Sequence, residues 1–240
     1  SPKPSMDFHI DRGVSDIHFQ KNILGPAYLK LGWRFHSSHL RKIENGNLES
    51  TLAGLSNAFD SGLLAEVGYD TRDSEFEPYH GERLLLQGYF PRDKMLSSRR
   101  FERFLVLVES YWALTTNLHL KLQGFYSSVS DEAPFDWYSS LSGTVSFSGL
   151  RPTRYIDRSL LGAGAELRWK RWQPITVFGY VNSATLAHET KNLMAQKKRF
   201  GFGGGAELYL QRFRNRAVRF EVGNFGGEWN FTTMLGIPLD

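Results

Sequence analysis

Residues 36–39 read HSSH and place two hydroxyl groups and two imidazoles within four consecutive positions. A histidine that takes the proton of a serine hydroxyl turns that serine into a nucleophile, provided that a third group orients the imidazole. Ser37 or Ser38 with His36 or His39 would form the catalytic pair of a lipid hydrolase. The sequence identifies no acid partner for this pair, so a polar turn at the end of a strand is the favoured interpretation.

Two other segments match catalytic or cofactor motifs by letter. GLSNA (54–58) approaches the nucleophile elbow Gly-x-Ser-x-Gly, but no helix is predicted after it. GFGGGA (201–206) matches the dinucleotide motif Gly-x-Gly-x-x-Ala, but an alternating strand continues where a helix would have to receive the pyrophosphate. The chain has no cysteine and seven scattered histidines. We therefore expect no enzymatic activity, no metal site and no cofactor.

The elements that must position these residues alternate in polarity. In LLGAGAELRW (160–169), apolar side chains alternate with two glycines, a glutamate and an arginine. A period of two indicates a strand. The same pattern predicts strands over 27–36, 48–59, 63–72, 82–91, 101–112, 115–126, 160–171, 174–183, 199–210, 217–225 and 228–238. The stretch 48–59 alternates poorly, and 184–198 is predicted to be a loop with one or two helical turns.

The polar faces of these strands favour a membrane barrel over a soluble one. A soluble barrel turns its polar face to water, where glycines would only weaken the strands. Here the polar faces of 160–171 and 199–210 are rich in glycine. The apolar faces end in aromatic residues such as Trp112 and Trp229, as at the two interfaces of a bilayer. No run approaches the ~20 apolar residues of a spanning helix, so a helical membrane protein is excluded.

The lengths of the connections predict the number of strands. Compact connections at 112–116, 171–174 and 211–216 alternate with long ones at 127–159 and 184–198, although two short connections break the alternation. Short turns on the periplasmic side and long outer loops are typical of outer-membrane barrels. With both termini on the inner side the number must be even, so a further strand is predicted in 7–20. The fold class is therefore an all-β, transmembrane antiparallel β-barrel of about 12 strands (range roughly 10–14).

The order of the local patterns resembles the BamA superfamily of outer-membrane barrels, of the surface-antigen type. GYDTRDSEFEPYHGERLLLQG (68–88) resembles its strand, periplasmic turn and strand, and APFDWYSSLSGTVSFSGLRPTRY (133–155) resembles the segment that leads into its inward-folded loop. GPAYLKLGW (25–33) is most similar to barrels attached to patatin-like phospholipases. The residues that carry the turn signature are Asp70, Arg72, Phe76, Pro78 and Gly81.

The resemblance implies a long loop that folds into the lumen, where its arginine meets acidic residues of the two following strands. Carried over, the arginine is Arg151, its first partner is Glu166, and Asn182 stands where the family has an aspartate. The aromatic residue of the loop motif is displaced to Tyr155, and Pro152 replaces its glycine. The inward glycines that would give this loop room are Gly162, Gly164, Gly201, Gly203 and Gly205.

The resemblance also implies an organisation and a place in the cell. Residues 25–240 would form the barrel and residues 1–24 an N-terminal segment with the possible first strand. That segment is too short for a periplasmic domain, so a short form without such domains is expected. The bacterial outer membrane is the expected location.

The expected function is non-enzymatic action on lipid or polypeptide at the seam between the first and last strands, by membrane perturbation, insertion or translocation. The expected partners are outer-membrane lipids, a second copy (a homo-oligomer such as a dimer) and a separate periplasmic chain. Nucleic acid is not expected, because the net charge is only +4 and basic residues are interleaved with acidic ones. A passive or plugged pore and the lipid hydrolase are the alternatives. Inward charges of both signs favour an occluded interior crosslinked by ion pairs.

Overall fold

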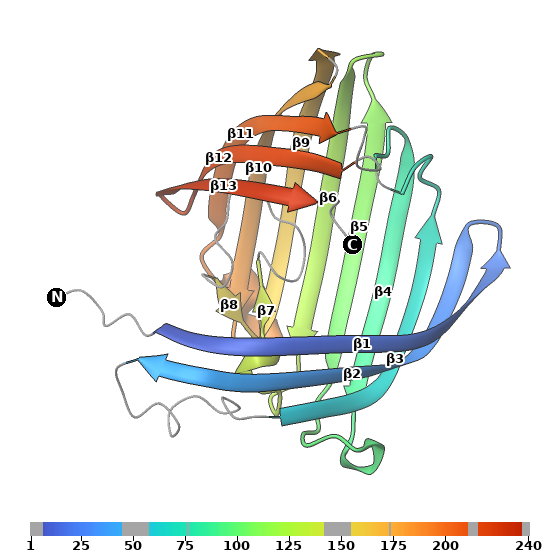
Figure 1. The fold of residues 1–240 in the computed structure, drawn as a ribbon, viewed down its shortest axis with the longest axis vertical. Helices are drawn as coiled ribbons and strands as arrows, with labels where there is room; N and C mark the ends of the chain where they lie inside the picture. Colours follow the sequence, from blue (N-terminus) through green and yellow to red (C-terminus); the bar gives the residue numbers. More distant parts are fainter. Residues whose placement is uncertain are drawn as a thin grey trace. The chain divides into compact units, whose positions relative to one another are not determined.

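The protein is all-β, and its described residues form one sheet of eleven antiparallel strands (Figure 1). The computed structural model describes residues 7–44, 58–75, 77–141, 155–172, 174–210 and 216–236. In sheet order the strands are β1 (Asp7–Leu24), β2 (Ala27–Glu44), β3 (Ala58–Asp70), β4 (Gly81–Pro91), β5 (Arg103–Ala113), β6 (Leu118–Val129), β9 (Ser159–Trp172), β10 (Ile175–Ala187), β11 (Arg199–Leu210), β12 (Arg216–Phe225) and β13 (Glu228–Gly236). Neighbours in the chain are thus neighbours in the sheet, apart from a short two-stranded ladder inserted between β6 and β9.

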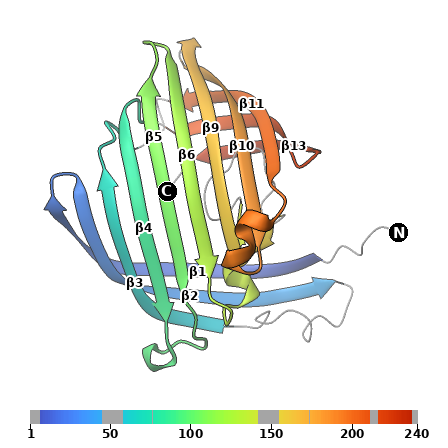
Figure 2. The ribbon, with the colours of Figure 1, turned by 180° about the vertical axis from the view of Figure 1, so that it is seen from behind.

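The remaining elements are short. The two-stranded ladder is formed by β7 (Ser139–Ser140) and β8 (Ile156–Asp157). The 3₁₀ helices are η1 (Asp93–Met95), η2 (Phe135–Trp137) and η3 (Thr190–Ala195), and η3 lies beside the ends of β9 and β10 in Figure 2. None of the helices in the described ranges is long and apolar enough to cross a membrane.

Most of the predicted strands are confirmed, including the one in 7–20, which is β1. The predicted strand over 48–59 is not observed as a separate strand, because Ala58 and Phe59 begin β3 and β2 is the neighbour of β3. Residues 48–57 lie outside the described residues. The sheet has eleven strands, an odd number, so the requirement for an even number is not met by the described part of the chain.

The chain divides into two compact units, each with its own core. Unit 1 comprises 1–67, 87–104 and 129–138, and unit 2 comprises 68–86, 105–128 and 139–240. The core of unit 1 is formed by Leu64, Tyr89, Phe101, Val129, Ala133 and Trp137. The core of unit 2 is formed by Leu85, Leu107, Phe125, Leu141, Leu160, Ala184 and Phe225. Within unit 2, Leu141 borders the segment 142–154, which lies outside the described residues.

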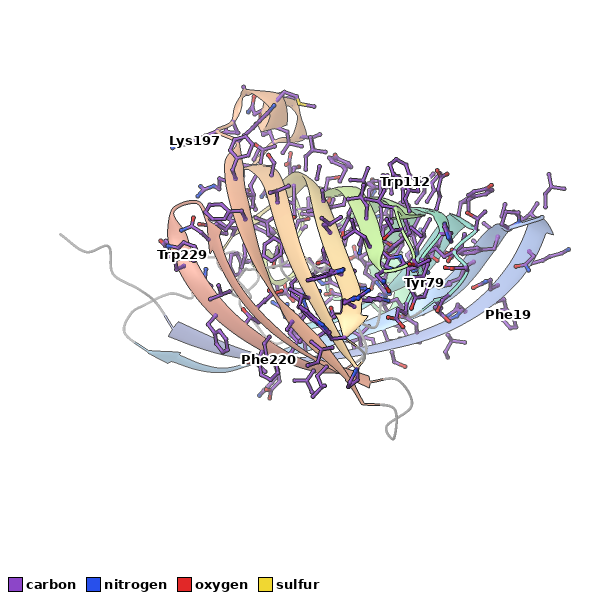
Figure 3. All side chains as sticks on the ribbon, turned by 90° about the horizontal axis from the view of Figure 1, so that it is seen from above. Phe19, Tyr79, Trp112, Lys197, Phe220 and Trp229 are labelled. Atoms are coloured by element: carbon purple, nitrogen blue, oxygen red, sulfur yellow. The ribbon has the colours of Figure 1, made fainter. Side chains whose placement is uncertain are left out.

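On β10 the two faces of the strand differ in burial, because apolar side chains are exposed on one face and the alternate side chains are buried. On β10, Val177 and Val181 are exposed, whereas Phe178 and Tyr180 between them are buried. The outer face is defined here by such exposed apolar side chains and the inner face by the buried ones. Phe220 and Trp229 likewise point away from the sheet on its outer face (Figure 3). Exposed aliphatic and aromatic side chains on strand after strand form a large apolar surface that water disfavours.

The connections of the hairpins follow from their residues. Gly226 and Gly227 join β12 to β13 with positive φ angles of 64° and 96°, which a two-residue hairpin requires and which glycine adopts without strain. Gly25 has a φ of 54° in the equally short turn between β1 and β2. These two strands have 18 residues each and are the longest of the described strands.

Candidate functional site

The inner face of unit 2 carries a network of ion pairs centred on Arg219 of β12. Its Nη2 lies 2.8 Å from Glu166 Oε2, its Nη1 2.7 Å from Glu207 Oε1, and its Nε 2.9 Å from Glu221 Oε2. The register explains these contacts, because Glu207 is the direct cross-strand partner of Arg219 and Glu221 follows two residues later on the same face. The guanidinium carbon also lies 3.7 Å from the ring centroid of Phe178. One arginine therefore contacts three nearly buried carboxylates and offsets part of their charge.

The network continues across the sheet through alternating charges. Arg168 of β9 contacts Glu166 (Nε–Oε1, 3.0 Å) and Glu207 (Nη2–Oε1, 2.6 Å). On the neighbouring strands, Lys121 Nζ lies 2.7 Å from Glu109 Oε1 and Arg83 Nη1 lies 3.6 Å from Glu109 Oε2. Apart from Glu109, these side chains belong to the charges predicted to face inward. Charges of both signs placed alternately along the inner face stabilise it, because each desolvated charge has a partner.

The predicted loop lock can be followed only in part. Glu166 is bound by Arg168 and Arg219, while the predicted partner Arg151 lies outside the described residues. Asn182 is buried on the inner face, and its amide oxygen fills the space beside Gly164. The contact between Arg151 and Glu166 therefore stays a prediction.

Tyr155 is the described residue that follows the predicted loop tip most closely. Its ring packs against Phe225, with centroids 5.3 Å apart, and Arg199 lies 4.7 Å from its ring centroid. Its carbonyl accepts a hydrogen bond from the amide of Leu141 on the other side of 142–154. Both ends of that segment are therefore held on the inner face of unit 2.

The inward glycines make room for side chains of neighbouring strands. A Cβ atom on Gly162 would meet the ring of Phe125, and one on Gly201 would meet the ring of Phe225. Those on Gly203 and Gly205 would meet Tyr180 and Phe178, together with the backbone of β12. Aromatic rings thus occupy the space that the sequence assigned to the loop, and a role of these glycines towards residues 142–154 stays a prediction.

The signature turn between β3 and β4 has a defined internal structure. Asp70 binds Arg72 through both carboxylate oxygens, with the shortest distance 2.8 Å from Arg72 Nη2. Gly81 has a φ of 105°, which explains the glycine at this place in the signature. Pro78 lies in the same turn, and Phe76 lies outside the described residues.

This turn reaches across the intervening strands β4, β5 and β6 to the inner face of unit 2. Glu77 forms an ion pair with Lys170 of β9, and the ammonium of Lys170 lies 4.0 Å from the ring centroid of Tyr79. Tyr79 also packs edge-on against His119 of β6, with centroids 4.6 Å apart. The turn therefore lies over the inner wall at this end of the strands.

Replacing Lys170 with methionine is expected to release the turn from β9. Methionine keeps the apolar stem but removes the ion pair with Glu77 and the cation–π contact with Tyr79, which is worth about 0.5–2 kcal/mol. Planar-bilayer recordings should show a higher conductance than for the unmodified chain. Arg171→Met changes the same net charge on the exposed face of β9 and serves as the control. Equal conductance of both variants would contradict a closing role of the turn.

Replacing Asp73 with alanine is expected to disorder the turn locally. Asp73 Oδ1 accepts hydrogen bonds from the backbone amides of Tyr79 (2.8 Å) and His80 (3.3 Å). Desolvation alone would raise the pKa of Asp73, but these two amides lower it below its usual value. A lowered pKa stabilises the turn above the usual aspartate pKa of about 3.9, and this contribution is lost as the pH falls through the lower folded value.

Hydrogen exchange of the two amides measures this effect. In the unmodified chain, protection of Tyr79 and His80 should disappear on acidification, whereas the Asp73→Ala variant should lack it at every pH. Asp93→Ala, in an exposed position of η1, is the control and should leave both amides protected. Protection that persists in Asp73→Ala would refute the assignment.

The HSSH segment is divided between the two faces of β2. His36 and Ser38 are buried on the inner face, while Ser37 and His39 are exposed on the outer one. His36 Nδ1 lies 3.6 Å from Asp60 Oδ2. The acid that the sequence did not identify is Asp60, which is 24 positions further along the chain and lies beside His36 in unit 1.

Asp60 is already bound by other groups. Arg99 donates to Asp60 Oδ1 (3.0 Å) and Oδ2 (2.5 Å) and also to both oxygens of Asp136 (3.1 Å each). The indole of Trp137 donates to Asp60 Oδ2 at 2.8 Å. Asp60, Asp136 and His36 offer ligand atoms within 4.8 Å of one another, a spacing that would suit a metal ion. Because Arg99 and Trp137 bind the carboxylate oxygens, the cluster is an internal ion pair rather than an open metal site.

The geometry does not favour nucleophilic catalysis at this place. The hydroxyl of Ser38 is buried and hydrogen-bonds to none of the described residues, whereas an activated serine needs a bond to its histidine. GLSNA lies outside the described residues except for Ala58, which begins β3. GFGGGA lies within β11, as the alternation predicted, and has no helix after it for a dinucleotide.

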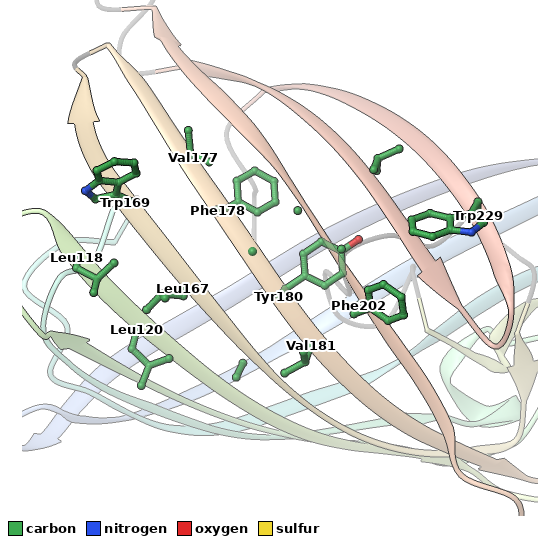
Figure 4. A pocket seen from close by; sticks show the side chains of 15 residues that line it. Leu118, Leu120, Leu167, Trp169, Val177, Phe178, Tyr180, Val181, Phe202 and Trp229 are labelled. Atoms are coloured by element: carbon green, nitrogen blue, oxygen red, sulfur yellow. The ribbon is translucent and has the colours of Figure 1, made fainter.

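An apolar groove of about 810 Å³ lies mainly along the outer face of unit 2 (Figure 4). It runs across strands β6 to β13 around Gly179 and Gly204, which are paired partners on β10 and β11. Leu167, Val181 and Phe202 line it, and none of its lining residues is charged. The groove belongs to the same exposed apolar wall as the rest of the outer face.

The cluster around Arg99 could not be found from the sequence. Arg99 follows η1, Asp136 lies in η2, and Asp60 lies in a strand that was predicted to begin later. In the sequence these residues appear only as charges near aromatic residues, and this pattern does not indicate which of them pair. By contrast, the alternation placed Glu166, Arg168, Glu207 and Arg219 on one face before their contacts were known.

The comparisons with known proteins find a likeness of structure and none of sequence. No protein-family model matches the sequence, and no curated protein matches it. Among solved structures, the chain is similar to BamA from Haemophilus ducreyi lacking POTRA domains 1–3, with a TM-score of 0.69 and 12% sequence identity. The match covers 95% of this chain and 55% of that one, so the chain spans little more than half of its length.

A likeness at this identity concerns the fold alone. It supports the BamA-type barrel and gives no support to the finer resemblance of 25–33 to barrels attached to patatin-like phospholipases, which stays a prediction. The order of the strands and the exposed apolar outer face agree with it. The chain is therefore an all-β protein with the antiparallel fold of the BamA barrel.

Proposed function

We propose that the chain is a bacterial outer-membrane barrel that acts on lipid or polypeptide at the membrane without catalysis of its own. One observation carries the proposal: apolar side chains are exposed on the outer face while charged side chains are paired on the inner one. A hydrocarbon environment makes this distribution favourable, because exposed leucine, valine and phenylalanine would otherwise face water. The likeness of the fold to BamA supports the same location.

The described contacts favour an occluded barrel over a passive pore. Ion pairs link Arg83, Lys121, Arg168 and Arg219 to glutamates on the inner face, and the turn 71–80 lies over the inner wall. Paired charges and a folded turn fill space that a diffusion pore would leave to water. Lipids of the outer membrane, a second copy and a separate periplasmic chain are the proposed partners.

Two assays test this proposal on the purified full chain. Reconstituted in liposomes, the protein should accelerate the exchange of labelled lipid between the leaflets or the insertion of an unfolded outer-membrane barrel. Liposomes with an unrelated barrel that lacks both activities are the control. Rates equal to this control in both assays would exclude the proposed action, and recovery of the chain in the soluble fraction of cells would exclude the location.

A further inference from the structure

Arg103, the first residue of β5, is an exception among the arginines in the interior of unit 1. Its guanidinium lies 5.7 Å from the ring centroid of Trp137, a core residue. Among the described residues, no carboxylate lies within ion-pair distance of it, and its Nε is buried without a hydrogen-bond partner. Other arginines on the inner faces have carboxylate partners within the chain, as Arg34 has in Asp16 and Arg99 in Asp60.

The surroundings of Arg103 are aromatic and positively charged. Trp137 stacks on Tyr89, with ring centroids 4.9 Å apart and planes at 24°. The guanidinium carbon of Arg34 lies 5.8 Å from the ring centroid of Tyr89. Because two hydrogen bonds of 2.8 and 2.7 Å join Arg34 to Asp16, that charge is neutralised. This neighbouring cation thus has its own anion, whereas Arg103 has no carboxylate partner among the described residues.

A desolvated cation without an anion is unfavourable, and proteins rarely retain one without a partner. The terminal nitrogens of Arg103 hydrogen-bond to none of the described residues, yet they are not sealed from solvent as Nε is. They present the planar fork of donors that matches the oxygens of a phosphate group. Contact with the indole of Trp137 holds the fork in place, since guanidinium groups stack favourably on aromatic rings.

We propose that Arg103 binds a phosphate group, either free or on a lipid headgroup, with Trp137 as the ring that supports its guanidinium. The anion supplies the negative charge that the described residues do not. Because Arg103 begins its strand, the bound group lies near one end of the strands rather than in their middle. This binding is independent of the activity proposed above.

Thermal unfolding of the full chain in non-ionic detergent tests the site with inorganic phosphate as the probe. At constant ionic strength, phosphate should raise the midpoint of the unmodified chain in a saturable way. Arg103→Gln should unfold at a higher temperature than the unmodified chain without phosphate, because an uncompensated charge is removed, and phosphate should not raise its midpoint further. Arg100→Gln changes the same charge in an exposed position and should respond to phosphate like the unmodified chain.

Without phosphate, the direction in which Arg103→Gln shifts the unfolding temperature distinguishes the proposed site from an internal ion pair. An Arg103→Gln variant less stable than the unmodified chain would overturn the proposal, as would an equal response of both to phosphate. Micelles containing phosphatidylglycerol, compared with phosphatidylcholine, distinguish the sources of the anion. A higher unfolding midpoint with phosphatidylglycerol alone assigns a lipid headgroup. A higher midpoint with both phosphatidylglycerol and inorganic phosphate assigns either source, and no rise with either probe refutes the site.

Discussion

Replacing Arg219 with alanine should lower the free energy of unfolding by about 3–5 kcal/mol, the cost of removing one partner of a buried ion pair. Its guanidinium contacts Glu166, Glu207 and Glu221, which are nearly buried and would then repel one another. Because Arg168 would still bind two of these carboxylates, we expect the loss of stability to stay within this range rather than to exceed it. Urea titration of the protein in lipid vesicles, followed by tryptophan fluorescence, measures the change.

An exposed ion pair provides the control for this experiment. Lys191 in η3 and Glu189, the residue just before it, form an ion pair of 2.9 Å, but both side chains are largely exposed to solvent. Surface pairs of this kind contribute little, so Lys191→Ala should unfold at the same urea concentration as the unmodified chain. Equal destabilisation by Lys191→Ala and Arg219→Ala would show that the inner network is no more than a solvated set of charges.

Replacing Val181 with arginine should destabilise the chain in a bilayer by about 2–4 kcal/mol, the cost of a charge on the lipid face near the midplane. Val181 is the central residue of β10 and is 60% exposed on the outer face. In a water-soluble protein the same change at such an exposed site would alter stability by about 0.5 kcal/mol or less. The substitution therefore tests directly which solvent surrounds the outer face.

Leu96 is the matched control, because it is 82% exposed but lies in the connection after η1. Leu96→Arg should fold into vesicles with unchanged stability, since its side chain stays in water. Folding free energies of both variants come from urea titration in phosphatidylcholine vesicles. A Val181→Arg variant that is as stable as the unmodified chain and dissolves without detergent would refute the membrane barrel.

Where apolar and polar side chains alternate regularly, this pattern was sufficient to predict the strands. In β9, Leu161, Ala163 and Leu167 alternate with glycines and charges, and this strand was predicted to within two residues at each end. The alternation is poor over 48–59, of which the structure describes only Ala58 and Phe59, the first residues of β3, so the strand predicted there stays a prediction. The second half of β2 was missed because the polar residues from His36 onward read as a turn, although their backbone continues the ladder with β1.

For the candidate site, the sequence predicts which face of a strand each residue occupies but not which residues pair. A period of two places Glu207 and Arg219 on the inner face, but their pairing depends on the register of β11 against β12, which the sequence does not reveal. The contacts of Arg99 with Asp60 and Asp136 join residues 37 to 39 positions apart. Such contacts depend on how connections fold back onto strands, and no local pattern encodes that.

The length of the β1–β2 hairpin has a consequence for access from water. Eighteen residues at about 3.3 Å each extend for about 60 Å, whereas a tilted strand needs only ~9–11 residues to cross hydrocarbon. The apolar alternation lies near the turn, around Ile17 and Phe19 and around Leu31 and Phe35, and the far half is mainly polar. In a bilayer the part of the hairpin beyond the buried His36 and Ser38 would extend past the acyl chains. With both termini on the inner side, as the connection lengths predict, that part would lie in the periplasm, where a protease or a partner chain could contact it while the other half of the hairpin remained folded.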